Sequence, residues 1–148
     1  MTFQHDCQAL QKTPLFRDVE VTKLKLLAMA SNRVALEPGE TLLRQGQPPE
    51  AVYVVLEGEA DVYLETPKGE VHLARIASGE VVGEIGALAG QPHSATIKAV
   101  GELTALRIER NSFLEILQEV PHLALAISRE LGRRLERMNE RFAALAAQ

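Results

Sequence analysis

The sequence predicts an α+β fold that is mainly β: an antiparallel jelly roll, or double-stranded β-helix, with N-terminal helices and a long C-terminal helix. Two observations predict this fold. Between Arg33 and Glu109, short apolar runs alternate with glycine-containing turns at nearly regular spacing. Before and after that region the apolar residues recur every three or four positions, which is typical of helices.

The length of 148 residues predicts one domain over 1–148, with helices at 1–31, a β-roll at 32–110 and helices at 111–148. The chain is 46% apolar and 24% charged, as ordinary globular proteins are. Its formal net charge of −4 argues against a general polyanion binder, because Lys and Arg supply most non-specific affinity for nucleic acids. The longest apolar runs, such as 51–56, are far too short to span a membrane.

The cysteine content and the first residues indicate the compartment. Cys7 is the single cysteine, so an intramolecular disulfide is impossible. The start of the chain carries Gln4, His5 and Asp6, where a signal peptide would be apolar. We therefore expect a cytoplasmic protein that has no membrane partner.

The N-terminal region, residues 3–30, predicts two short helical pieces separated by Pro14. Leu15 and Phe16 form a small apolar plug after it. The second piece has near-helical apolar spacing at Val21, Leu24, Leu27 and Met29.

The middle region predicts an antiparallel sheet, because no stretch between its strands is long enough for a crossover helix. The strand-sized runs are RVALEPGE, TLLRQGQPPE, AVYVVLEGE, ADVYLETPKGE, VHLARIASGE, SATIKAVGE and LTALRIER. Turn geometry is expected at Gly39, Gly46, Gly58, Gly69, Gly79 and Gly101.

The C-terminal region predicts a helix that begins after Asn111, as N-cap, breaks at Pro121 and then runs nearly to Gln148. One face of the last helix is apolar, at Ala124, Ile127, Leu131, Leu135, Met138, Phe142 and Leu145. This near-heptad spacing favours a homodimer seam over simple packing on the roll. The seam is assigned to Ile127, Leu131, Met138 and Phe142. The other face has charges of mixed sign and is interpreted as solvated.

Residues 82–97, VGEIGALAGQPHSATI, have the parts of an anion site, and we call them the cassette. Gly83 lets the backbone approach a ligand closely, and residues 85–88 can form one helical turn with free amides. Glu84 precedes that turn, where its carboxylate can accept a ribose hydroxyl. Ser94 and Ala95 are expected to begin the next strand. The alternative is a tight connection between two strands in which Glu84 caps the turn.

The cassette, preceded by LEPGETLLRQG and AVYVVLEGEADVY, resembles the cyclic nucleotide-binding domain of catabolite-activator-type regulators, protein kinase A regulatory subunits and nucleotide-gated channels. The resemblance runs from about Pro14 to the end of the chain. It implies an eight-stranded jelly roll whose two C-terminal helices move when ligand binds.

The resemblance also implies roles for individual residues. Glu84 would hold the ribose 2′-hydroxyl, Ser94 and Ala95 would meet the phosphate, and Asn139 would reach over the base. A serine rather than a threonine at position 94 weakly favours cyclic AMP over cyclic GMP as the ligand. The implied ligand-binding residues are Gly83, Glu84, Ile85, Gly86, Ala87, His93, Ser94, Ala95 and Asn139.

Two positions depart from the family pattern. Val82 stands where an aromatic residue is usual, and His93 stands where the phosphate-binding arginine belongs. Arginine offers a permanent charge and a two-pronged donor, whereas histidine is mostly neutral at pH 7. We therefore expect a weaker hold on phosphate. The alternative is that His93 is a surface-turn residue in a pocket that no longer binds.

These observations leave two functions open. The first is a sensor module for a cyclic nucleotide, with cyclic AMP ahead, or for a related nucleoside. The second is a dimerising interaction protein that keeps the fold and binds no nucleotide. DNA binding by this chain alone is not expected, because the residues end at Gln148 without a helix-turn-helix.

An enzyme is the least supported class, and no catalytic residue, metal site or cofactor is assigned. A jelly roll with a catalytic metal needs clustered ligands, but His5, His72, His93 and His122 lie far apart in sequence. Cys7 has no adjacent base and is expected in a mobile N-terminus.

Overall fold

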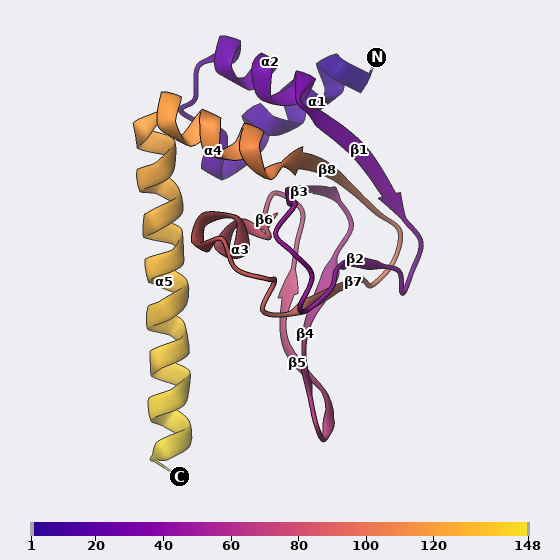
Figure 1. The fold of residues 1–148 in the computed structure, drawn as a ribbon, viewed down its shortest axis with the longest axis vertical. Coiled ribbons are helices and arrows are strands. Elements are labelled where there is room, and N and C mark those ends of the chain that lie inside the picture. The colour runs from indigo at the N-terminus through magenta and orange to yellow at the C-terminus, as the bar shows by residue number, and fades with distance from the viewer. Residues whose placement is uncertain (1, 148) are drawn as a thin grey trace.

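The structure is a computed structural model that describes residues 2–147, with helices at both ends of a β-roll (Figure 1). Met1 and Gln148, the limits of the predicted domain 1–148, lie outside the described residues. The helices are α1 Thr2–Lys12, the 3-10 helix η1 Pro14–Phe16, α2 Val21–Met29, α3 Glu84–Ala89, α4 Arg110–Glu119 and α5 Pro121–Ala146. The strands are β1 Ser31–Leu36, β2 Thr41–Leu43, β3 Ala51–Glu57, β4 Ala60–Thr66, β5 Gly69–Ile76, β6 Val81–Val82, β7 Thr96–Ala99 and β8 Leu103–Glu109.

The strands form two four-stranded sheets, in the orders β1-β8-β3-β6 and β2-β7-β4-β5. Within each sheet, every pair of neighbouring strands is antiparallel. The predicted α+β architecture, mainly β with an antiparallel roll, N-terminal helices and a long C-terminal helix, is therefore confirmed. In Figure 1, α1, α2 and α4 gather at one end of the roll, α5 runs along its side, and the β4–β5 hairpin extends away from α1, α2 and α4.

The apolar side chains form two buried clusters, one on each side of strand β3. Val52 and Val54 contribute to a cluster with the helices, which includes Phe16 and Phe113. Val55 contributes to the second cluster, which lies within the roll. Burial of each large apolar side chain stabilises the fold by about 1.5–3 kcal/mol. Strand β3 therefore holds the roll and the helical cap together.

The N-terminal helix is part of the core, so the expectation that Cys7 lies in a mobile segment is wrong. Cys7 is buried in the helical cluster together with Leu10 of the same helix. The Asp6 carboxylate accepts two hydrogen bonds from Arg33 of β1, of 2.6 and 3.1 Å. This ion pair and the apolar contacts fix α1 against the roll.

The transition from β8 to α4 corrects a predicted cap. The helix begins at Arg110 with Glu109 at the N-cap position, two residues earlier than the prediction with Asn111 as the cap. The strand ladder ends at the pair Ala51–Glu109, so the helix can begin at the next residue. The Arg110 N–H then donates to the Glu50 carbonyl at 2.9 Å. The predicted break at Pro121 is confirmed, because α4 ends before it and α5 starts with it.

The apolar stripe of α5 has a buried half and an exposed half. Ile127 is buried in the protomer's own core, and Leu131 packs against that core. Ile127 is therefore not on the surface where we predicted a seam. The exposed part of the seam lies further along the helix, where Met138 is 64% exposed and Phe142 is 76% exposed.

Candidate functional site

The cassette folds as a strand, a sharp turn and a short helix. Strand β6 ends at Val82, and Gly83 takes a left-handed conformation with φ of 87°, which L-residues with side chains disfavour. Helix α3 then starts at Glu84, so the predicted helical turn at 85–88 is confirmed. Ser94 and Ala95 lie in the bend before β7 rather than at its start, because the pairing of β7 with β4 begins at Thr96.

Gly86 closes the cassette against its own return loop. The amides of Gly90 and Gln91 both donate to the Gly86 carbonyl, at 2.8 and 3.2 Å. A Cβ atom on Gly86 would lie 2.9 Å from the Gln91 carbonyl oxygen, which is closer than real contacts allow. The loop therefore fits tightly over α3 only because residue 86 has no side chain.

A cavity of about 130 Å³ opens in front of the cassette. Seven of the predicted site residues line this cavity: Gly83, Glu84, Ile85, Gly86, His93, Ser94 and Ala95. The wall also contains Val82, where the family pattern has an aromatic residue, and side chains that the sequence analysis did not assign, which are Leu43, Val62, Ile76, Ile97 and Arg134.

Glu84 is the buried acid of the cavity, with a side chain that is 5% exposed. Its Oε1 accepts a hydrogen bond of 2.6 Å from Nη1 of Arg134. Within residues 2–147, no donor reaches the buried Oε2. Burial raises the pKa of the Glu84 carboxyl, and the Arg134 charge partly opposes that increase. Glu84 therefore lines the cavity and has one buried carboxylate oxygen without a hydrogen-bond donor among the described residues.

His93 lies inside the fold and lines the cavity, so the alternative of a surface-turn residue is wrong. The residue is 7% exposed. Its ring contacts the start of α3, since a Cβ atom on Gly86 would lie 3.2 Å from Nδ1 and one on Gly83 would lie 3.5 Å from Cε1. Two backbone hydrogen bonds fix His93 to the loop after β2. Its N–H donates to the Gln47 carbonyl at 2.9 Å, and its carbonyl accepts from the Gly46 N–H at 2.8 Å. Burial lowers the pKa of the imidazole.

Two predicted ligand-binding residues are placed elsewhere. Ala87 is buried behind the cassette and does not line the cavity. Asn139 is exposed on α5 and also does not line it. Five residues of helix turn a side chain through about 140°, so Asn139 points away from the face that carries Arg134. Contact between Asn139 and a ligand in this protomer's cavity stays a prediction.

Arg134 was not predicted as a site residue, because it was assigned to the charged, solvated face of the last helix. Arg134 follows Ile127 and Leu131 at helical spacing of seven and three residues, on the face that packs against the roll. A cation in line with buried apolar residues signals a buried acidic partner. Glu84 is that partner, and Nη2 of Arg134 also lies 3.5 Å from the Val81 carbonyl oxygen.

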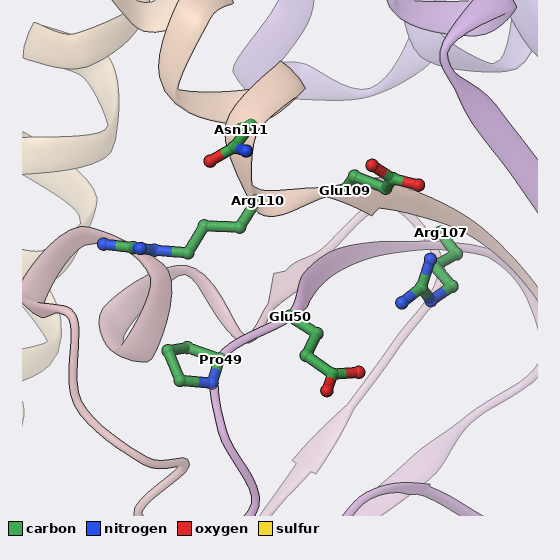
Figure 2. A pocket seen from close by; sticks show the side chains of 6 residues that line it. All are labelled: Pro49, Glu50, Arg107, Glu109, Arg110 and Asn111. Atoms are coloured by element: carbon green, nitrogen blue, oxygen red, sulfur yellow. The ribbon is translucent and has the colours of Figure 1, made fainter.

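A second hollow, of about 320 Å³, lies near the start of α4 (Figure 2). Its walls are polar and carry charges of both signs, at Pro49, Glu50, Arg107, Glu109, Arg110 and Asn111. In Figure 2 the Arg110 side chain extends toward α3, where its Nε donates to the Ala87 carbonyl at 2.8 Å. This hollow is therefore structural in part, since Arg110 fixes the end of α3 that faces away from the cavity.

Comparison with known families explains this arrangement. Residues 33–120, more than half of the chain, match the cyclic nucleotide-binding domain family. The chain belongs to that family. The predicted resemblance is thereby confirmed at the level of the family and of its fold.

Three similar proteins illustrate the range of this cyclic nucleotide-binding domain. The sensor domain of the transcriptional regulator DNR from Pseudomonas aeruginosa is 29% identical, with a TM-score of 0.81 and 93% of both chains covered. The regulatory subunit of a cAMP-independent protein kinase A from Trypanosoma brucei is 26% identical, with a TM-score of 0.77, and the match covers 86% of this chain and 47% of that one. An uncharacterized NTE family protein of Mycobacterium tuberculosis is 30% identical over 127 residues, or 86% of this chain.

The chain spans only 21% of the length of that NTE family protein. Among the described residues, no helix combines the length and the apolar character that crossing a membrane requires. In the same residues, no three His, Cys, Asp or Glu side chains are grouped so that they would hold a metal ion.

Proposed function

We propose that this chain is a small-molecule sensor module that binds a cyclic nucleotide, with cAMP first, or a related nucleoside, and signals through its C-terminal helices. The supporting observation is that Glu84 lines the cavity and that its buried Oε2 has no donor within residues 2–147. An unsatisfied buried acceptor costs about 1–3 kcal/mol, and a ligand hydroxyl would relieve that cost. Membership of the cyclic nucleotide-binding domain family supports the same class of ligand.

The route to the C-terminal helices is proposed to start at Arg134. Within residues 132–146 of α5 it is the single residue that is half-buried, and the others are exposed. Its guanidinium contacts Glu84, the residue that a ribose hydroxyl would engage. A ligand at Glu84 therefore changes the attachment of α5 to the roll.

The sensor is proposed to act as a cytoplasmic homodimer without enzymatic activity. Leu135, Met138 and Phe142 form an exposed apolar stripe at near-heptad spacing, which a second copy of α5 would cover. Phe142 and Met138 lie beyond the part of the helix that packs on the protomer's own core.

The alternative function is a dimerising interaction protein that binds no nucleotide. The observation that favours it is His93, a buried imidazole where the family pattern has an arginine. The T. brucei relative is named as cAMP-independent, which supports a role for this fold that does not depend on that ligand.

Calorimetric titration with cAMP, cGMP and adenosine distinguishes the two functions. Hydrogen exchange of residues 121–146 with and without saturating ligand tests the signalling route in the same sample. We expect at least one ligand to bind with 1:1 stoichiometry per chain and to alter exchange near Arg134. Absence of binding by all three would favour the interaction protein, and binding without altered exchange would reject the route through α5.

A further inference from the structure

We propose that the cavity prefers a neutral ligand with a vicinal diol, a ribonucleoside, over an anionic cyclic nucleotide. This inference rests on the proposed sensor function, which admits both ligand classes, and it places the nucleoside ahead of cAMP. The charges at the cavity wall decide between them.

The cavity has no positive charge in excess. Among the described residues at its wall, Glu84 and Arg134 are the two that carry a full charge. They are joined to each other at 2.6 Å, and the second contact of Arg134 is the Val81 carbonyl, which is also an acceptor. A bound phosphodiester would bring one negative charge into a wall whose own charges already cancel.

His93 does not supply the missing charge. Its ring is packed against the backbone of Gly83 and Gly86 and is shielded from water. That burial lowers its pKa, so the imidazole is neutral near pH 7. Burying an anion without a charged partner is costly, because the loss of hydration is not compensated. A neutral imidazole can still donate one hydrogen bond and accept another.

A ribonucleoside uses the groups that the cavity offers. One hydroxyl of its diol would donate to Oε2 of Glu84, the acceptor that residues 2–147 leave unsatisfied. The side chains of Val62, Ile76 and Val82 give the wall an apolar part that accepts an uncharged ligand. Neither contact requires a phosphate.

The experiment is a calorimetric comparison of adenosine, cAMP and 2′-deoxyadenosine at pH 7.5, with wild type, His93→Arg and His93→Lys. The wild type should bind adenosine about tenfold or more tightly than cAMP, and 2′-deoxyadenosine more weakly, because the charge and the diol decide affinity. In the two charged variants, cAMP should gain about tenfold or more while adenosine changes little. Thermal melting of each variant verifies that it is folded.

The outcomes distinguish failure of the neutral-ligand inference from failure of the proposed sensor function. If wild type binds cAMP more tightly than adenosine, the neutral-ligand inference is overturned while the sensor function stands. If the order is as expected but neither folded variant gains affinity for cAMP, the charge argument is overturned. If no ligand binds to any of the three proteins, the sensor function falls together with the inference.

Discussion

Replacement of Glu84 by glutamine tests the acceptor at the centre of the proposed site. Glutamine keeps the size of the side chain but removes the charge and one of the two acceptor oxygens. In the wild type, Oε1 accepts a hydrogen bond of 2.6 Å from Arg134, and the buried Oε2 has no donor within residues 2–147; we propose that a ligand hydroxyl donates to it. A hydrogen bond to a charged group contributes about 1.5–3 kcal/mol, so affinity should fall roughly 10- to 150-fold.

The thermal stability of Glu84→Gln, unlike its ligand affinity, should not fall at pH 7. The pKa of Glu84 is higher in the folded protein than in the unfolded chain, because of burial. Its favourable contribution is therefore present at low pH and is lost as pH rises through the folded-state pKa. Glutamine resembles the protonated form, so Glu84→Gln should melt no lower than wild type at pH 7. Any advantage in melting temperature should vanish on acidification toward pH 4.

Glu80→Gln is the matched control for both measurements. Burial also raises the pKa of Glu80, which lies near Arg134 but not at the cavity wall. This variant should show the stability trend and retain full ligand affinity in calorimetry. Equal affinity of wild type and Glu84→Gln for every ligand that binds would refute the role given to Glu84.

Three other predictions concern the surface and the turns. Met138→Glu with Phe142→Glu should give a folded monomer in light scattering, because both residues are exposed in the protomer; a monomeric wild type at high concentration would remove the seam. The chain should not shift duplex DNA at physiological salt, given its charge of −4, and saturable salt-sensitive binding would overturn this. In urea titrations, Gly86→Ala should lower the free energy of unfolding by about 1–3 kcal/mol. Gly132→Ala, whose new Cβ atom would meet open space, should raise it by about 0.5–1 kcal/mol. Equal effects would contradict the tight fit of Gly86.

The parts of the site that were predictable are contiguous in sequence. Gly83, Glu84 and the α3 turn follow one another, so their residue types and spacing define the local backbone without information from other segments. The alternation of apolar runs and glycine turns likewise determined an antiparallel roll. Glycine at 83 and 86 meets requirements that short-range geometry imposes.

The parts that were missed depend on contacts between distant segments. Arg134 meets Glu84 across fifty positions, and its spacing from Ile127 alone does not identify the partner. Cys7 is buried in an apolar cluster that also includes Phe113 and Leu123 from the other end of the chain. Helix α4 starts two residues earlier than predicted because the β3–β8 ladder, a long-range pairing, ends at Glu109. Tertiary packing, rather than local propensity, decided each of these features.

The pH dependence of affinity provides a test that does not depend on absolute binding strength. Burial lowers the pKa of His93 in the free protein below its ordinary value near 6.5. A bound phosphodiester beside the ring would favour the imidazolium and raise that pKa, whereas a neutral nucleoside would not. The complex with a cyclic nucleotide then binds protons more readily than the free protein does.

By linkage, affinity for cAMP should rise as pH falls through the bound-state pKa of His93 and level off once the free imidazole is also protonated. Adenosine affinity should stay flat across the same window, and cAMP itself remains a monoanion there. His93→Arg should raise cAMP affinity by about 1–3 kcal/mol at pH 7.5 and remove the slope, while His93→Ala should remove it at weak affinity. Glu84 also faces the cavity and titrates with a raised pKa, so a slope that persists in His93→Ala would belong to Glu84. If wild-type cAMP affinity is equal at pH 5.5 and pH 8 and His93→Arg gains nothing, then the ring of His93 does not meet the phosphate.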